Sequence, residues 1–442
     1  MPPGKPLPPG TAGRSDRAHF HVPSTRNETI MIKKIPIEAL QVGMYIHDLN
    51  CSWADHDFLL NRFRIRGEGQ IAKIQKLGIR YLYIDTQKGD DYLDAPTEME
   101  VKADLENKLL ATVQASGAVP RPAAHPEPVS IRVEMARAQK VQKEALRVVH
   151  DVMMDVRMGR QVESEKVAAV VGEITQSIFR NPDALLSLCR IKKKDTYTFE
   201  HCVSVCALLT SFACSLGMDQ KSIQDAGIGG LIHDLGKMMV PDEILNKPGR
   251  LTEPEFEIVK GHVNFGRDCL SGAEHISPLA MEVTSEHHER YDGTGYPKNL
   301  CGNEISMLGR MAAIVDVYDA ITSDRVYHKG IAPHEAIRKL YEWSTQHFEP
   351  SLVENFIRVV GIYPTGSVVT LKSGRVGVVI THRQDDLLHP VLRIIYDYRR
   401  EARVPPFSLD LAGRAAREQE ESIVGLNEEI VQQLEIHPMD YL

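Results

Sequence analysis

The stretch LIHDLGK, residues 231–237, decides how the rest of this sequence is interpreted. Its apolar run is broken by His233 and Asp234, side by side, with Lys237 about one helical turn beyond the histidine. Three ionisable side chains have little use in an ordinary core helix. A divalent metal ion would use the first two as ligands, and the lysine would then be a neighbouring acid or a contact for a phosphate group.

Other histidines and aspartates in the same helical region extend this pattern. Each alone is more often a hydrogen-bonded surface or core residue, but seven such groups spread over four or five helices favour a metal site. The seven are His201, His233, Asp234, His262, His287, His288 and Asp316. Imidazole and carboxylate suit Fe, Mn, Zn or Co, and the lack of thiolates argues against a structural zinc site. Adjacent helical residues point about 100° apart, so His233 can bind one metal while Asp234 bridges to a second.

The composition is that of an ordinary soluble globular protein, with 442 residues, 43% of them hydrophobic and 25% charged. The length suggests two to three domains. No apolar run is long enough for a transmembrane helix, and the N-terminus lacks the apolar core of a signal peptide, so we expect a cytoplasmic protein without a membrane span. The net charge of −8 disfavours nucleic-acid binding as the main activity. Cys202 and Cys206 are interpreted as a buried apolar pair rather than a metal site.

The N-terminal part divides into three segments. Residues 1–31 contain six prolines within the first thirty and are expected to be a disordered extension, with Met31 as an alternative start. Residues 32–100 are expected to form a small α+β domain, because two β-rich runs flank a stretch of helical spacing. Trp53, His56 and Phe58 within it are interpreted as local core and turn residues rather than a ligand site. The Ala- and Pro-rich residues 111–130 are predicted to be a linker.

The remaining segments are predicted from their periodicity. Residues 131–190 are expected to be a helical connector with one apolar stripe, formed by Val141, Ala145, Val148, Val152 and Val156. This stripe is equally compatible with a homodimer seam along the 131–180 helix and with packing on the next domain. Residues 191–361 are predicted to be an all-α catalytic domain. Residues 362–415 are predicted to be a β extension with a hairpin turn at Ser373-Gly374, and residues 416–442 an acidic helical tail.

HDLGK (233–237) followed by HHERYDGTGYP (287–297) resembles the HD-GYP family of bacterial phosphodiesterases, a branch of the HD phosphohydrolases. The similarity continues through KDTYTFEHCVSV (194–205), KGHVNFG (260–266) and DVYDAITSDRVY (316–327), all in family order. Residues 32–100 look like an uncharacterised domain often found in front of it. The resemblance implies a multidomain protein: an all-α HD-type catalytic domain, a small α+β N-terminal domain and a short C-terminal β-hairpin extension.

The resemblance also implies roles for individual residues. The seven histidines and aspartates match the family's metal ligands, and Asp234 matches the carboxylate that bridges two metals. Lys237 matches the lysine that contacts the scissile phosphate. Arg325 matches an arginine that binds substrate phosphate, and Lys329, after His328, stands near a position that is often basic in relatives. Asp319 is expected to support a ligand rather than to be one.

Two further features concern the number of metals and the Gly-Tyr-Pro motif from which the family takes its name. Members of the family that hold three metals have a glutamate four residues before the first histidine, where this sequence has Tyr197, so we expect two divalent ions, Fe or Mn. Gly295, Tyr296 and Pro297 form the naming motif. The local interpretation of this motif is a tight turn, and the family interpretation is domain shape or a contact with a partner protein.

The function implied by the resemblance is metal-dependent hydrolysis of cyclic di-GMP in bacterial second-messenger signalling. The end product is either linear pGpG or, where a second cleavage follows, GMP. Water activated between two metals attacks a phosphodiester, with Asp234 and Lys237 as the catalytic residues. One alternative is a family member that acts on a cGAMP-type cyclic dinucleotide. Another is a cyclic-dinucleotide-binding regulator without turnover. A general HD phosphohydrolase for nucleotides is disfavoured, because such an enzyme does not need HHERYDGTGYP.

Overall fold

The computed structural model describes residues 31–50, 62–115, 129–190 and 197–442, apart from 248, 250, 275, 325–329, 345, 383–385 and 427–435. The expectations for residues 1–30, for Trp53, His56 and Phe58 as local core and turn residues, and for most of the 111–130 linker therefore concern residues outside the described ones. The chain separates into two compact units, one up to residue 98 without 51–60, and one formed by the remainder.

The first unit is a small α+β fold, as predicted. Its antiparallel sheet has the strand order β1 (Ile32–Pro36), β4 (Tyr81–Asp85), β2 (Tyr45–Asp48) and β3 (Phe63–Arg64). Helix α1 (Glu68–Gln75) buries Ile71 and Ile74, three residues apart on one face. A 3-10 helix, Ile37–Ala39, follows β1.

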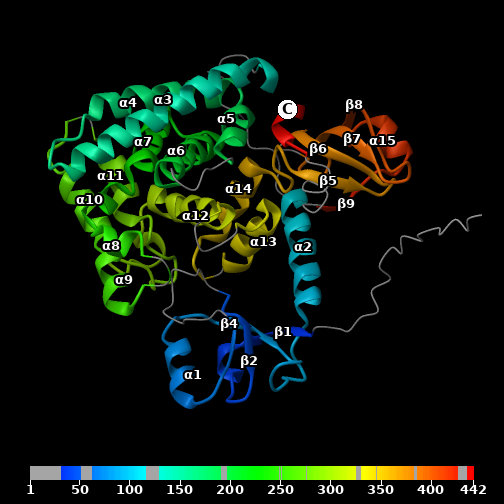
Figure 1. Ribbon diagram of the computed structural model, residues 1–442, viewed down its shortest axis with the longest axis horizontal. Helices are drawn as coiled ribbons and strands as arrows, with labels where there is room; N and C mark the ends of the chain where they lie inside the picture. The colour runs from blue at the N-terminus through cyan, green and yellow to red at the C-terminus, as the bar shows by residue number, and fades with distance from the viewer. Residues whose placement is uncertain are drawn as a thin grey trace, which may run out of the picture. The chain divides into compact units, whose positions relative to one another are not determined.

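The second unit begins in α2 (Glu98–Ala115) and contains the predicted all-α domain (Figure 1). The helices that follow are α3 (Ile131–Arg157), α4 (Ser164–Arg180), α5 (Pro182–Cys189), α6 (Tyr197–Ser215), α7 (Gln220–Ile232), η4 (Leu235–Met239), α8 (Asp242–Leu245), α9 (Glu253–Lys260), α10 (His262–Leu270), α11 (Pro278–Glu286), η5 (Gly302–Glu304), α12 (Met307–Thr322), α13 (Pro333–Trp343) and α14 (Pro350–Val360). Helix α6 lies at the centre and packs against α7, α12, α3, α4, α5 and α14.

The apolar stripe of α3 packs inside this unit. All five stripe residues are buried, in one cluster with side chains of α4, α5, α6 and α7. Of the two interpretations left open for the stripe, packing on the next domain is therefore the one that the structure supports. The stripe gives no support for a homodimer seam, because the chain itself covers it.

Helix α6 also explains an apparent membrane signal. Among the described residues it is the one helix that is long and apolar enough to cross a membrane, but 72% of that stretch is buried inside the structure. It carries His201 in its second turn and forms the middle of the helical core. Burial of this kind is typical of a core helix.

The C-terminal extension is larger than the hairpin predicted for it. Its five-stranded antiparallel sheet has the order β8 (Ala402–Asp410), β7 (Val391–Asp397), β6 (Arg375–Thr381), β5 (Val368–Leu371) and β9 (Ile423–Leu426). The predicted turn at Ser373-Gly374 joins β5 to β6, and β7 pairs with β6 on the other side.

The prediction of one acidic helix over 416–442 is wrong for the described residues. Helix α15 (Arg414–Glu418) is short, β9 pairs with β5 through Val369↔Leu426 and Thr370↔Gly425, and a 3-10 helix spans Pro438–Tyr441. The run from Ile423 to Leu426 contains β-branched residues next to the open edge of β5. Backbone pairing along that edge outweighs the helical pattern of the local sequence.

Candidate metal centre

The fold brings all seven predicted metal ligands together in the middle of the helical domain. His201 comes from α6, His233 ends α7, and Asp234 precedes η4. The other four are His262 at the start of α10, His287 and His288 directly after α11, and Asp316 in α12. Their ligand atoms form two groups, each within 4.8 Å: one of His201, His233 and Asp316, and one of Asp234, His262, His287 and His288.

Asp234 lies between the two groups. Its Oδ2 is 3.5 Å from His201 Nε2 and 3.3 Å from His233 Nε2. Its Oδ1 is 3.4 Å from His262 Nε2 and 3.9 Å from His287 Nε2. Each carboxylate oxygen thus faces a different pair of imidazoles, which is the arrangement that a carboxylate bridging two cations requires.

Asp316 also faces both groups, although less closely. Its Oδ1 is 3.0 Å from His201 Nε2 and 3.8 Å from His233 Nε2, while its Oδ2 is 3.8 Å from His288 Nδ1. The two aspartates therefore approach the five histidines from two different elements, with acceptor atoms pointing at the same small volume.

Two buried polar atoms in this volume have no hydrogen-bond partner among the described residues: His233 Nε2 and Asp234 Oδ1. Leaving such atoms unpaired costs roughly 1–3 kcal/mol each, so a fold retains them where something else binds there. A nitrogen lone pair beside a carboxylate oxygen is the donor set of a divalent transition metal. The side chains present therefore fit a pair of divalent cations.

The outward nitrogen of most of these imidazoles is held in place. His201 Nδ1 hydrogen-bonds Asp319 Oδ2 at 2.6 Å, and the Ser204 hydroxyl donates to the other oxygen of Asp319. Backbone carbonyls accept from the Nδ1 atoms of three more: Gly230 O for His233 at 2.8 Å, Val259 O for His262 at 2.6 Å and Thr284 O for His287 at 3.0 Å. These bonds turn Nε2 of each ring toward the centre. Asp319 contacts His201 and belongs to neither group.

Burial and charge set the protonation states that metal binding needs. Burial lowers the pKa of His262 to about 4 and that of His287 to about 3, and it also holds the pKa of His288 well below its usual range. Burial by itself would raise the pKa of Asp234, but the ammonium of Lys237 and the nearby imidazoles outweigh it and hold that pKa well below its usual range. Three imidazoles are thus neutral and the carboxylate is ionised near pH 7, the forms that coordinate metals.

The rest of HDLGK has a local role as well. Lys237 Nζ is 2.5 Å from Asp234 Oδ2, and a quarter of the lysine side chain is exposed. A Cβ atom on Gly236 would lie 1.9 Å from the carbonyl oxygen of His262, so only glycine allows η4 to pack this closely on α10. The motif therefore supplies two centre residues, a neighbouring ammonium and the contact that brings His262 into place.

The GYP segment folds back against His288. The rings of Tyr296 and His288 stack with centroids 4.7 Å apart, and the Tyr296 N–H donates to the His288 carbonyl at 3.1 Å. Buried Glu289 accepts the N–H groups of Lys298 at 2.7 Å and Leu300 at 3.0 Å, which closes the loop. A Cβ atom on Gly295 would lie 2.3 Å from the backbone nitrogen of Arg290, so glycine is needed for this close approach. The segment is bent at residues 296–298 and packs against a histidine of the centre.

The sequence did not identify every residue around the metal centre, and two predicted substrate contacts lie outside the described residues. Ser204 was missed, although its position three residues after His201 on α6 was a usable signal. Lys260 was missed too; its Nζ lies 5.6 Å above the Tyr296 ring. Tyr197 stacks on His201 with ring centroids 5.7 Å apart. Arg325 and Lys329, the predicted substrate contacts, lie outside the described residues.

Comparison with known proteins covers both units. Residues 32–167 match a family described as a domain of unknown function (DUF3391), and residues 178–352 match a family described as HD domain. The cyclic di-GMP phosphodiesterase PA4108 of Pseudomonas aeruginosa is 40% identical over 396 residues, which cover 89% of this chain and 92% of that protein.

Two proteins of Vibrio cholerae are similar over shorter stretches. A cyclic di-GMP phosphodiesterase is 42% identical over 134 residues, 29% of this chain and 27% of its own length. A 3′3′-cGAMP-specific phosphodiesterase is 40% identical over 124 residues, 28% of this chain and 24% of its own length. The similarity to the Pseudomonas protein thus extends over both units, whereas these two cover less than a third of the chain.

Proposed function

This chain belongs to the HD-GYP family of HD-domain phosphodiesterases, and from that premise we propose that it hydrolyses cyclic di-GMP to linear pGpG, and pGpG further to GMP, with two divalent metal ions. The observation that carries the proposal is the position of Asp234, whose two oxygens each face a different pair of imidazoles. A non-catalytic regulator would have no need for this arrangement with Lys237 beside it.

The ligand roles follow from the two groups. His201, His233 and Asp316 would hold one ion, His262, His287 and His288 would hold the other, and Asp234 would bridge them. Imidazole and carboxylate ligands without thiolate suit Fe, Mn, Zn or Co, and of these we propose Fe or Mn, as the family resemblance implies. Two such ions supply an activated water near neutral pH and offset charge on the phosphate. Tyr197 stands at the position where three-metal relatives have a glutamate ligand, and this replacement supports two ions rather than three.

The protein residues around the ions orient the ligand side chains and stabilise the charge that develops on the phosphate. Asp319 holds the His201 ring, and Tyr296 packs on His288, so the ligand set is fixed before substrate binds. Lys237 lies at the edge of the centre with part of its side chain exposed, where its ammonium can offset the negative charge that grows on the phosphoryl oxygens. We place Arg325 and Lys329 as further phosphate contacts on the strength of the family motif alone.

Cyclic di-GMP is favoured as the substrate because the Pseudomonas protein of that activity matches almost the whole chain. The Vibrio cGAMP-specific enzyme has nearly the same identity over a shorter stretch, so cGAMP is the second candidate.

A competition assay separates the two substrates. The metal-loaded protein is incubated with equal concentrations of cyclic di-GMP and 3′3′-cGAMP, and the linear products are separated by chromatography over time. We expect pGpG to appear first, followed by GMP, with cGAMP consumed more slowly. Faster loss of cGAMP would make that dinucleotide the substrate. No hydrolysis of either with Mn or Fe(II) added would contradict the proposed reaction.

A further inference from the structure

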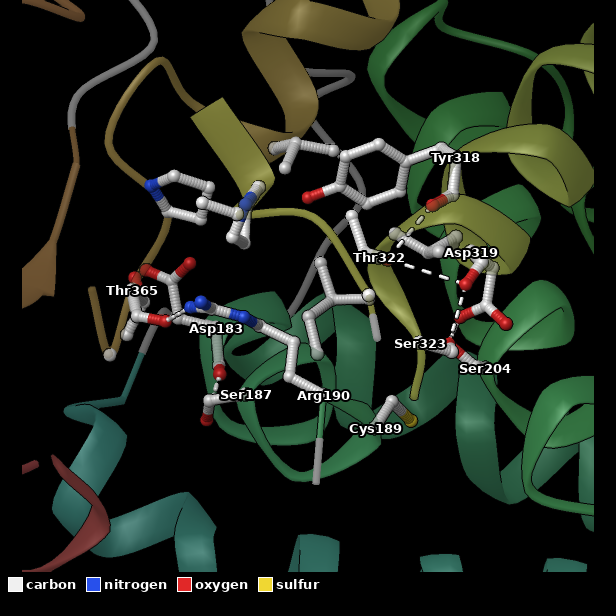
Figure 2. Close-up of a pocket in the computed structure, with 18 of the residues that line it drawn as sticks. Asp183, Ser187, Cys189, Arg190, Ser204, Tyr318, Asp319, Thr322, Ser323 and Thr365 are labelled. Atoms are coloured by element: carbon white, nitrogen blue, oxygen red, sulfur yellow. Dashed lines mark hydrogen bonds between the residues drawn. The ribbon is translucent and has the colours of Figure 1, made fainter. Parts of the chain in front are cut away.

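A cavity of about 330 Å³ lies behind the metal centre, between the helical domain and the C-terminal extension. Figure 2 shows Asp183, Arg190 and Thr365 at one end of it, and Ser204, Tyr318, Asp319 and Ser323 at the other. Asp319 contacts the Nδ1 side of His201 and accepts a hydrogen bond from Ser204, whereas the centre uses the Nε2 side of His201. A molecule in this cavity would therefore touch Asp319 without touching the metals.

Two buried polar atoms that line the cavity have no hydrogen-bond partner among the described residues. Thr365 is 5% exposed and its hydroxyl is unpaired. The His382 side chain is 8% exposed, and its Nδ1 is likewise unpaired. Because His382 Nε2 lies 3.2 Å from the Val359 carbonyl, the tautomer with its hydrogen on Nε2 donates to that carbonyl, and in this tautomer Nδ1 is an acceptor. Unpaired buried polar groups at a cavity wall are free to bind a polar ligand or an ordered water.

The acceptors are arranged for an amino group. His382 Nδ1 is 3.6 Å from Asp183 Oδ1, too far for a hydrogen bond between them, while the Thr381 hydroxyl donates to the other Asp183 oxygen at 3.1 Å. An –NH₂ group placed between the two acceptors would donate one hydrogen to each. The ligand must therefore present N–H donors at this end.

The remaining lining residues supply hydrogen-bond donors and apolar surface. The Arg190 guanidinium lies at the same end and donates to the Thr365 carbonyl, and the Thr365 hydroxyl can donate to a ligand. Leu186, Leu208, Ile331 and Val360 supply apolar surface. Guanine combines an exocyclic amino group and a ring N–H with the acceptors O6 and N7, the atoms that arginine recognises on this base. The cavity has the volume of a small-molecule site.

We propose that this cavity is a second ligand site, distinct from the metal centre, which binds the guanine base of a free guanine nucleoside or nucleotide. The proposal goes beyond the phosphodiesterase reaction and does not depend on it. Guanosine is the suitable probe, because without a phosphate it offers little to the metal centre. Inosine is the matched control ligand, since it has the same ring system without the exocyclic amino group.

Isothermal titration of the full-length, metal-loaded protein with guanosine tests the site. We expect one guanosine per chain in this cavity and at least about tenfold weaker binding of inosine, the equivalent of one or two lost hydrogen bonds. Thr365→Val removes an unpaired hydroxyl with little change in shape, and it should weaken guanosine binding about three- to tenfold. The matched control is Ser367→Ala, which removes another buried, unpaired hydroxyl two residues away that does not line the cavity.

Asp183→Asn provides a second variant. It replaces a carboxylate oxygen by an amide in the same shape, and it should reduce the preference for guanosine over inosine. No guanosine binding to the wild-type protein would overturn the proposal and leave the cavity as a water site only. Equal affinity for inosine, or equal weakening by Thr365→Val and Ser367→Ala, would also overturn it. Turnover of cyclic di-GMP is not part of this readout, so failure of the proposed reaction would be a separate result.

Discussion

Removal of the Asp319 side chain should weaken metal binding although Asp319 belongs to neither ligand group. Its carboxylate is buried and accepts hydrogen bonds from His201 Nδ1 at 2.6 Å and from the Ser204 hydroxyl. Asp319→Ala would leave the His201 N–H buried without its acceptor and free the imidazole to turn. Loss of such an outer partner reduces metal affinity by about 10- to 100-fold, which corresponds to about 1.4–2.8 kcal/mol.

The assay is titration of the metal-free protein with Mn²⁺ by calorimetry, with circular dichroism to verify that the helices are intact. Ser204→Ala is the control, because it removes the second hydrogen bond to Asp319 and keeps the one to His201. It should change affinity much less than Asp319→Ala does. If Asp319→Ala bound Mn²⁺ as tightly as the wild-type protein, the reasoning that this carboxylate orients His201 would be refuted.

Three further predictions concern the lysine, the loop and pH. Lys237→Ala should keep both metals, measured by elemental analysis, and lose about 10²–10³-fold in turnover; loss of metal instead would make the lysine structural. Tyr296→Ala should weaken metal binding through His288, while Tyr296→Phe should not, because the stacked ring is retained; equal calorimetric affinities for the two variants would contradict this role. The metal-free protein should lose stability as pH falls from 6.5 toward 4. The unfolded chain protonates its histidines near pH 6.5, whereas in the folded protein His262 and His287 stay neutral down to pKa values of about 4 and about 3. Urea unfolding at pH 7 and pH 4.5 measures the difference, and the same unfolding midpoint at both pH values would contradict this prediction.

Local sequence patterns were sufficient to predict the secondary structure of segments that determine their own structure. The helices of the catalytic domain, the strands around α1 and the turn at Ser373-Gly374 all follow from periodicity and turn chemistry in short windows of sequence. The outcome for the α3 stripe depended on its surroundings, since an apolar face looks the same whether it packs inside the chain or on a second copy. The 423–426 strand was missed for a similar reason: its partner edge, β5, lies about 50 residues earlier in the chain.

In the metal centre, too, the local sequence predicted some features, whereas others depend on how the helices pack. The types and order of its residues were visible in the sequence, and the family resemblance identified them. Which oxygen of Asp234 faces which imidazole depends on how α6, α7, α10 and α11 pack, and no local pattern encodes that. The stacking of Tyr296 on His288 is likewise a tertiary contact, which explains why the motif had suggested only a turn or a partner contact.

The most direct test is to purify the wild-type protein and the Asp234→Ala variant without air, measure metal per chain, and follow cyclic di-GMP and its products by chromatography. We predict about two divalent ions per wild-type chain with pGpG formed, and a folded variant that has lost metal and nearly all turnover. A variant that retained more than about a tenth of the wild-type rate would contradict the assignment of Asp234 as the carboxylate between two metals.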